Sequence, residues 1–273
     1  MKNVLLLCCF AVCGWAQTAA KTPLQTAMEV IDQGRFEGNI LKRKQFLISI
    51  SAAGPNAKVI EIVETELATA KTPEVRQAAA AALGEAKSTG SIGKLQKAMA
   101  EDEADVAFTA ARSLWQLGDR TGREFFEQAL LGERGDNPGL IKGGMRDARA
   151  KMANPKGLAL MGVKEGLGML FGPAAMGVTV YQELQKDAGA TARTLAASLL
   201  AKDTDPSSVA VLEEGLSDKN WIVRAACAKG LAERASIGSV VKLAYLLDDK
   251  ADGSRYTAAA AIVRLEDLKK AGY

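Results

Sequence analysis

The chain has 273 residues, of which 48% are hydrophobic and only 5% aromatic, so it can bury a large core built mostly from aliphatic side chains. It contains no histidine and carries a formal net charge of +3. The missing histidine excludes Ser-His-Asp and Cys-His catalysis. The small net charge gives no electrostatic indication of nucleic-acid binding.

Residues 1–16 have the pattern of a secretory signal peptide. Lys2 supplies a positive start, an apolar run follows over 4–12, and small residues precede the expected cleavage site after Ala16. The apolar run is too short to span a membrane. We therefore expect an exported protein, periplasmic or secreted, whose mature chain begins at Gln17.

Three of the four cysteines lie within this segment, so a lipoprotein is an alternative. However, none of Cys8, Cys9 and Cys13 follows the small residue that lipoprotein signals require. The mature chain keeps only Cys227, which excludes an intramolecular disulfide and a two-cysteine redox site. We expect Cys227 to be a small buried hydrophobic residue.

The residues that follow predict a pair of helices over 24–53. Thr22-Pro23 is a typical helix start, and Gly54-Pro55 ends the second helix. We expect this pair to form a degenerate capping unit at one end of the fold. Residues 56–69 then carry apolar side chains at helical spacing, and Pro73 begins the first clear repeat helix.

A short pattern that begins at Val75 returns four times along the chain. It consists of an apolar anchor, an Arg, two spacers, two small residues, two spacers and an aliphatic residue. The anchors are residues 75, 106, 192, 223 and 254, so three of the four spacings are 31 residues. On a helix, the anchor, the small pair and the last residue form one apolar arc. An apolar pattern at 92–99 also recurs at 209–216 and 240–247, so a pair of helices repeats as a unit.

Charged positions of the pattern predict a ladder of ion pairs. The Arg lies inside the apolar arc, where an unpaired charge would be costly. Arg76 has no acid five residues before its anchor, where Ala70 stands, and Glu101 has no Arg in its own unit, where Ala107 stands. Pairing between adjacent units explains both exceptions. The ladder residues are Arg76, Glu101, Asp187, Arg193, Asp218, Arg224, Asp249 and Arg255.

This arrangement resembles the HEAT-repeat family, in which an Asp in the turn and an Arg in the second helix form such a ladder. The period of 31 is similar to that of the short HEAT-like repeats of the phycobilisome-lyase type. The resemblance covers roughly residues 56–131 and 187–267. It implies an all-α, right-handed α-solenoid of HEAT-like helix pairs, and a chromophore-lyase activity by analogy only, because this scaffold serves many roles.

The repeat register breaks between the anchors at 106 and 192, whose separation of 86 residues exceeds two periods by 24. A Gly-rich apolar insert over 154–186, preceded by a basic run, supplies the additional residues. The pattern is compatible with three roles for the insert: it fills a gap in the solenoid, it contacts a membrane surface, or it binds a partner protein. The residues expected to take part in an interaction are Lys142, Arg146, Arg149, Lys156, Met161, Met169 and Phe171.

Two other motifs lack an essential residue. Residues 166–172 resemble a dinucleotide-binding loop, but the last glycine is one position late and no strand precedes it. Residues 248–253 resemble a calcium loop, but Lys250 occupies a ligand position and Ala259 stands where the bidentate Glu is needed. We therefore expect no cofactor, no metal and no enzymatic activity.

Four segments follow from these patterns: a signal peptide over 1–16, N-terminal repeats over 17–153, the insert over 154–186 and C-terminal repeats over 187–273. They predict a non-catalytic protein–protein interaction scaffold of a bacterial-type cell envelope, with an unidentified protein partner and no nucleic acid. The alternatives are a peripheral membrane protein held by the basic run and the insert, and an enzyme related to chromophore lyases.

Overall fold

The computed structural model describes residues 21–100, 103–123, 125–127, 187 and 189–273. These residues form helices joined by short turns, with no strand among them, so the predicted all-α solenoid is confirmed. The N-terminal helices are α1 (Pro23–Gly34), α2 (Ile40–Ile50), α3 (Ala57–Thr69), α4 (Pro73–Glu85), α5 (Ile92–Met99) and α6 (Ala104–Gln116). The C-terminal helices are α11 (Ala190–Leu200), α12 (Ser207–Gly215), α13 (Trp221–Glu233), α14 (Val240–Ala244) and α15 (Asp252–Lys270). One-turn 3-10 helices are η1 (Ser51–Ala53), η2 (Thr89–Ser91), η4 (Ile237–Ser239) and η5 (Tyr245–Asp248).

The helices begin and end where the sequence carries the corresponding signals. Thr22 caps α1 in a capping box, in which its Oγ1 accepts the Gln25 backbone N–H at 3.2 Å. Pro23 and Pro73 occupy the first turns of α1 and α4. Gly54, with φ of 65°, ends the helical stretch that follows α2. Local chemistry therefore sets these boundaries.

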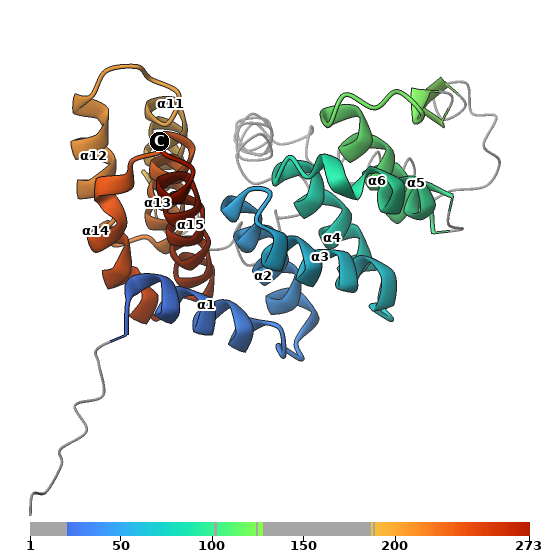
Figure 1. Cartoon of the computed structure of the whole chain (residues 1–273), viewed down its shortest axis with the longest axis horizontal. Helices are drawn as coiled ribbons and strands as arrows, with labels where there is room; N and C mark the ends of the chain where they lie inside the picture. The colour runs from blue at the N-terminus through green and yellow to red at the C-terminus, as the bar shows by residue number, and fades with distance from the viewer. Residues whose placement is uncertain (1–20, 101–102, 124, 128–186, 188) are drawn as a thin grey trace, which may run out of the picture.

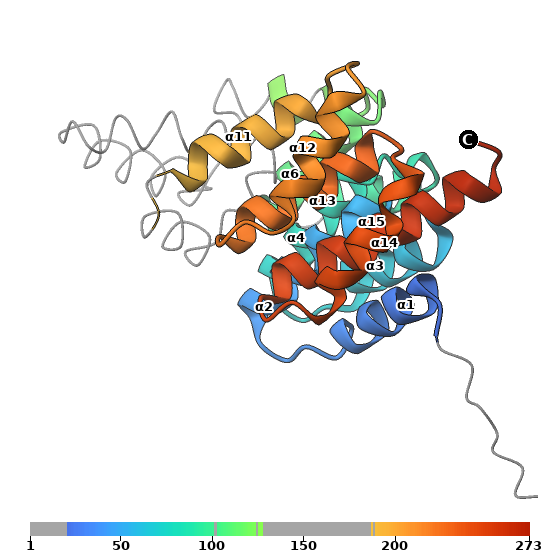
Figure 2. The ribbon, with the colours of Figure 1, turned by 90° about the vertical axis from the view of Figure 1, so that its left-hand side faces the viewer.

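The second helices of the units pack side by side in one row. Helix α4 packs between α2 and α6, and α13 packs between α11 and α15. Ala79, Ala80 and Ala259 lie at these contacts and are completely buried, because small side chains let helix axes approach closely. Helices α3, α5, α12 and α14 each pack on the second helix of their own unit. Figure 2 shows α12 and α14 in front of α13 and α15.

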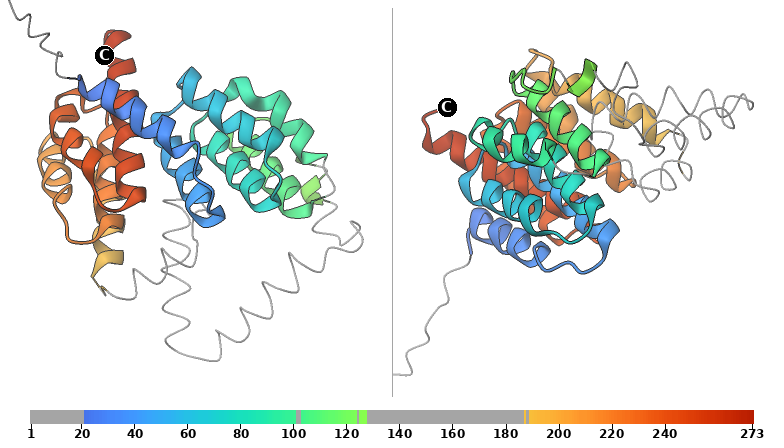
Figure 3. Two further views of the ribbon diagram at one scale, coloured as in Figure 1. Left: turned by 90° about the horizontal axis from the view of Figure 1, so that it is seen from below. Right: turned by 90° about the vertical axis from the view of Figure 1, so that its right-hand side faces the viewer.

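The order of the helices in the row differs from their order in the chain. The last helix, α15, packs against both α1 and α2, so the row runs α6, α4, α2, α15, α13, α11 (Figures 1 and 3). We call the contact of α15 with α1 and α2 the seam. Among the described helices, α6 and α11, which precede and follow residues 128–186 in the chain, stand at the two ends of the row.

The expectation that residues 24–53 form a capping unit at one end of the fold is therefore wrong. Helix α2 lies in the middle of the row beside α15, and α1 also packs on α15. The physical reason lies in α15, whose residues 256–263 are all buried. A helix with eight consecutive buried residues must be covered on every side, and its own unit covers only part of it.

Candidate functional site

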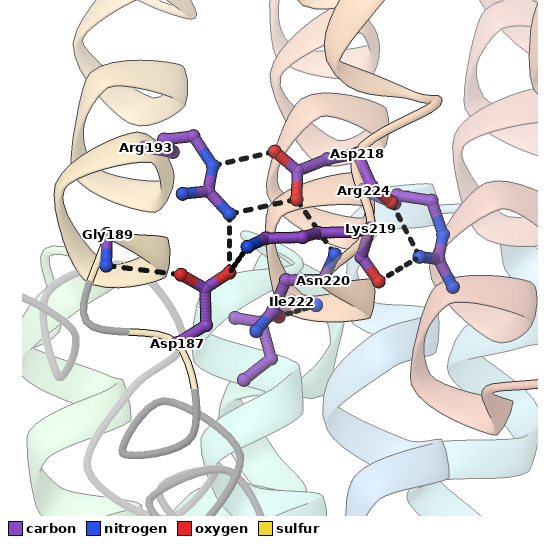
Figure 4. Close-up of polar contacts among 8 residues, drawn as sticks. All are labelled: Asp187, Gly189, Arg193, Asp218, Lys219, Asn220, Ile222 and Arg224. Carbon is purple, nitrogen blue, oxygen red and sulfur yellow. Dashed lines mark hydrogen bonds and ion pairs between the residues drawn. The ribbon is translucent and has the colours of Figure 1, made fainter.

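Bidentate ion pairs of the ladder join the second helices of adjacent C-terminal units. Arg224 in α13 donates from Nε and Nη2 to the two carboxylate oxygens of Asp249, both at 2.7 Å. Arg193 in α11 donates in the same way to Asp218, at 2.7 and 3.1 Å (Figure 4). The planar guanidinium matches a carboxylate in this geometry. The structure thus brings together these two predicted pairs across a unit boundary.

Each ladder Arg also contacts the turn of its own unit, six residues earlier in the chain. Arg193 reaches a side chain there, because its Nη2 donates to Asp187 Oδ2 at 2.7 Å. The other three use the backbone carbonyl: Arg76 with Ala70 O at 3.0 Å, Arg224 with Asp218 O at 2.7 Å and Arg255 with Asp249 O at 2.7 Å. Any residue supplies a carbonyl, so Ala70 can stand where other units carry an acid.

The ladder aspartates have a second task, which is to close the turn before the second helix. In each, Oδ1 accepts the backbone N–H two residues later; the pairs are Asp187 with Gly189 at 3.2 Å, Asp218 with Asn220 at 2.8 Å and Asp249 with Ala251 at 2.9 Å. Burial by itself would raise the pKa of Asp218 and Asp249. The hydrogen bonds from Arg and from the backbone outweigh burial, so both pKa values lie below the ordinary value.

In the N-terminal part, the ladder Arg contacts an acid that the sequence analysis did not name. Arg76 Nη2 lies 2.7 Å from Glu103 Oε1, and this hydrogen bond lowers the pKa of Glu103. Glu101, the expected partner, lies outside the described residues. The contact still joins two adjacent units, because Glu103 immediately precedes α6.

At the seam, the ladder of ion pairs continues through a lysine. Arg255 pairs with Asp252 in the first turn of α15, and Lys42 Nζ of α2 lies 3.1 Å from the same carboxylate. Beyond the seam, Arg43 Nη2 donates to Glu66 Oε1 of α3 at 2.5 Å. Burial would raise the pKa of Asp252, but its two cationic partners hold that pKa below its ordinary value.

A second polar cluster repeats on the first helices, and the sequence analysis missed it. The motif Ser-x-Gly-Ser-x-x-Lys occurs at 88–94 and at 236–242. In both copies, the second Ser donates to a Glu of the preceding first helix at 2.7 Å, and the Lys pairs with the same Glu. The residues are Ser91, Lys94 and Glu64 in one copy and Ser239, Lys242 and Glu213 in the other. The repetition of this motif was the signal in the sequence from which the cluster could have been predicted.

A small hollow of about 40 Å³, partly open to solvent, lies where the two parts of the row meet. We call it the seam pocket; it is lined by Gln45, Ile48, Ser49, Ser51, Ala52, Glu85, Trp221, Ile222, Ala225, Lys229 and Thr257. These residues come from α2, η1, α4, α13 and α15, so both parts of the chain contribute. An ion pair lies at its rim, where Lys229 Nζ is 3.5 Å from Glu85 Oε2. This ion pair joins α13 to α4.

Arg112 of α6 adds a second cation near Glu85. Burial lowers the pKa of Arg112, and the charge of Glu85 acts against that effect. Glu85 of the rim therefore interacts electrostatically with Arg112 as well as with Lys229. Trp221 begins α13 and lines the pocket. An indole, hydroxyls and a mixed-charge rim can bind both apolar and charged groups of a peptide.

A family model described as HEAT repeats matches residues 60–137 and 179–263, which together exceed half of the chain. The chain belongs to the HEAT-repeat family. No curated protein matches this HEAT-repeat protein. Among solved structures, human deoxyhypusine hydroxylase in complex with glycerol is similar at 18% identity, over 87% of this chain and 83% of that chain, with a TM-score of 0.31. A likeness at this level says nothing about activity. The finer resemblance to phycobilisome-lyase-type repeats stays a prediction.

The predicted interaction residues of the basic run and the insert lie outside the described residues, and their role stays a prediction. They are Lys142, Arg146, Arg149, Lys156, Met161, Met169 and Phe171. Within the described part of the chain, no helix is long and apolar enough to cross a membrane.

Proposed function

We propose that this HEAT-repeat protein is a non-catalytic scaffold of a bacterial-type cell envelope that binds a protein partner along its row of second helices. The seam pocket is the observation that carries the proposal, because it is a hollow lined only by second helices and η1. Stacked repeats typically present such extended surfaces to their partners. The signal-peptide pattern of residues 1–16 supports export.

The chemistry of the pocket fits a peptide segment with an apolar side chain beside a charged one. Trp221 and the buried Ile222 and Ala225 offer an apolar floor, and tryptophan is among the residues that contribute most at interfaces. Glu85 and Lys229 at the rim would orient the charged group of the partner.

A site-specific crosslinking experiment tests the proposal. A photoreactive amino acid is placed at Ser49 in the seam pocket, and at the exposed Val241 on α14 as the matched control. We expect the first position to crosslink one discrete envelope protein and the second to give none. Equal crosslinking at both positions, or none at Ser49, would contradict binding at the pocket.

Export is tested separately by the N-terminus of the protein recovered from the native cell. The signal pattern predicts that this terminus is Gln17. A protein that still begins at Met1 would remove the envelope location, while leaving the scaffold proposal in place.

A further inference from the structure

The seam is built from specific contacts of several kinds. The rings of Phe46 in α2 and Tyr256 in α15 pack edge to face, with centroids 5.0 Å apart. Asn56 Nδ2, just before α3, donates to Asp267 Oδ2 at 2.6 Å. Together with the Lys42 ion pair, these contacts extend along α15 from its first turn to its last. Aromatic, ionic and hydrogen-bonding contacts thus all join α15 to the N-terminal helices.

The backbones also approach closely here. A Cβ atom on Gly34 of α1 would lie 2.4 Å from the Phe46 ring and 3.0 Å from Tyr256. A Cβ atom on Gly253 of α15 would lie 2.4 Å from Gln45 Nε2 of α2. Contacts this tight mean that the two surfaces interlock, with a packing density typical of a protein interior.

The residues on the two sides of the seam form separate groups of repeats. Residues 21–127 contain helices α1 to α6, and residues 187–273 contain α11 to α15. Within each group, neighbouring units follow each other in the chain, whereas the two units that meet at the seam are the first and the last. In a solenoid, unit-to-unit interfaces supply much of the stability, and they do not require chain continuity.

We infer that the seam is a self-sufficient recognition interface, by which residues 187–273 bind residues 21–127 without help from the covalent connection. The partner that fits the surface of α15 is therefore the α1–α2 surface of the same kind of chain. Cleavage of the chain between the two groups leaves a stable one-to-one complex.

The test starts from the full-length protein with two inserted protease sites, one directly after residue 128 and one directly before residue 186. Cleavage at both sites separates the two groups covalently. We expect residues up to 128 and residues from 186 onward to co-elute in size-exclusion chromatography at micromolar concentration, with a native mass equal to their sum. Separate elution, or loss of helicity after cleavage, would overturn the inference.

A charge reversal then locates the interface at the seam. Lys42→Glu places a carboxylate against Asp252, and Lys94→Glu is the matched control, because Lys94 pairs with Glu64 inside the N-terminal group. Both lysine side chains are 55% exposed. We expect Lys42→Glu to raise the Kd of the cleaved complex about fivefold at low salt, and Lys94→Glu to leave it unchanged. The inference would be overturned if Lys42→Glu had no effect or if both variants acted equally.

Discussion

Phe46 and Tyr256 meet edge to face with their ring planes at 77°, although one belongs to the first helix pair of the chain and the other to the last. Both side chains are buried. Aromatic pairs in this geometry contribute about 0.5–1.5 kcal/mol beyond the area that they bury. The pair therefore fixes how α15 sits against α2, and it is the best single place to test the packing order of the row.

Tyr256→Ala should lower the free energy of unfolding by about 3 kcal/mol, because it leaves a cavity against Phe46. Urea denaturation followed by circular dichroism measures this change. Tyr245→Ala is the control, since Tyr245 is 79% exposed and Tyr256 only 6%. Equal effects of the two substitutions would contradict the position of α15 at the seam.

Arg224→Met should lower the free energy of unfolding by about 1–3 kcal/mol, because it leaves the Asp249 carboxylate without its bidentate partner. The Asp249 side chain is only 5% exposed, so water replaces the lost hydrogen bonds poorly. Arg123→Met, which breaks an exposed pair with Glu127, should cost less than about 0.5 kcal/mol. A denaturation midpoint for Arg224→Met equal to the wild-type midpoint would show that the ladder adds no stability.

Acid should destabilise the fold through the ladder aspartates. The folded pKa values of Asp218 and Asp249 lie below the ordinary value of about 3.9 that applies in the unfolded chain. Their contribution is therefore complete above pH about 4 and is lost as the pH falls through the lowered values. The urea midpoint should fall steeply below pH about 4. Asp249→Asn should make this fall shallower, whereas a change at the exposed Asp248 should not.

A substitution at Cys227 should compensate for the loss of stability caused by a substitution at Gly215. A Cβ atom on Gly215 would lie 2.4 Å from Cys227 Sγ, so Gly215→Ala should cost about 1–3 kcal/mol through overpacking. Adding Cys227→Ala removes the sulfur and should recover most of this loss, as a double-mutant cycle of unfolding free energies would show. Gly93→Ala, with nothing within 4 Å, should instead stabilise its helix slightly. Additive effects at 215 and 227 would refute the close approach.

The Cys227 thiol should not react with alkylating reagents in the folded protein. Burial raises its pKa to about 12, and the thiolate is the reactive form. Labelling followed by mass spectrometry should therefore proceed at the rate at which the protein unfolds. Rapid labelling of native protein at pH 7 would show that this side chain is accessible.

The sequence predicts the parts of this structure that repeat. The pairing of Arg193 with Asp218 and of Arg224 with Asp249 follows from a period of 31, because each unit places the same residues at the same points. The seam could not be predicted in this way. Lys42, Phe46 and Tyr256 are not part of the repeating pattern. Their spacing in the sequence therefore does not indicate that the first helices pack against the last one.

The seam pocket could not be predicted from the sequence for the same reason. Glu85 and Lys229 come together only because the helices pack in an order that differs from their order in the chain. No local signal in the sequence places Trp221 beside the α2 residues that also line the pocket. The cluster around the Ser-x-Gly-Ser-x-x-Lys motif, in contrast, could have been predicted from the sequence. Its two copies lie in corresponding units of the two parts and hold Glu64 and Glu213 alike.

The packing of α1 against α15 also decides how the molecule would respond to mechanical force. In a solenoid whose units stack in chain order, tension between the two ends of the chain stretches every unit interface in series. Here α1 packs on α15, which lies in the middle of the row. Tension applied between Pro23 and Lys270 would act on the contacts between the two groups of repeats, while the interfaces from α3 to α6 and from α11 to α13 stayed relaxed. A protein held by these two points would open at its centre, as two intact halves.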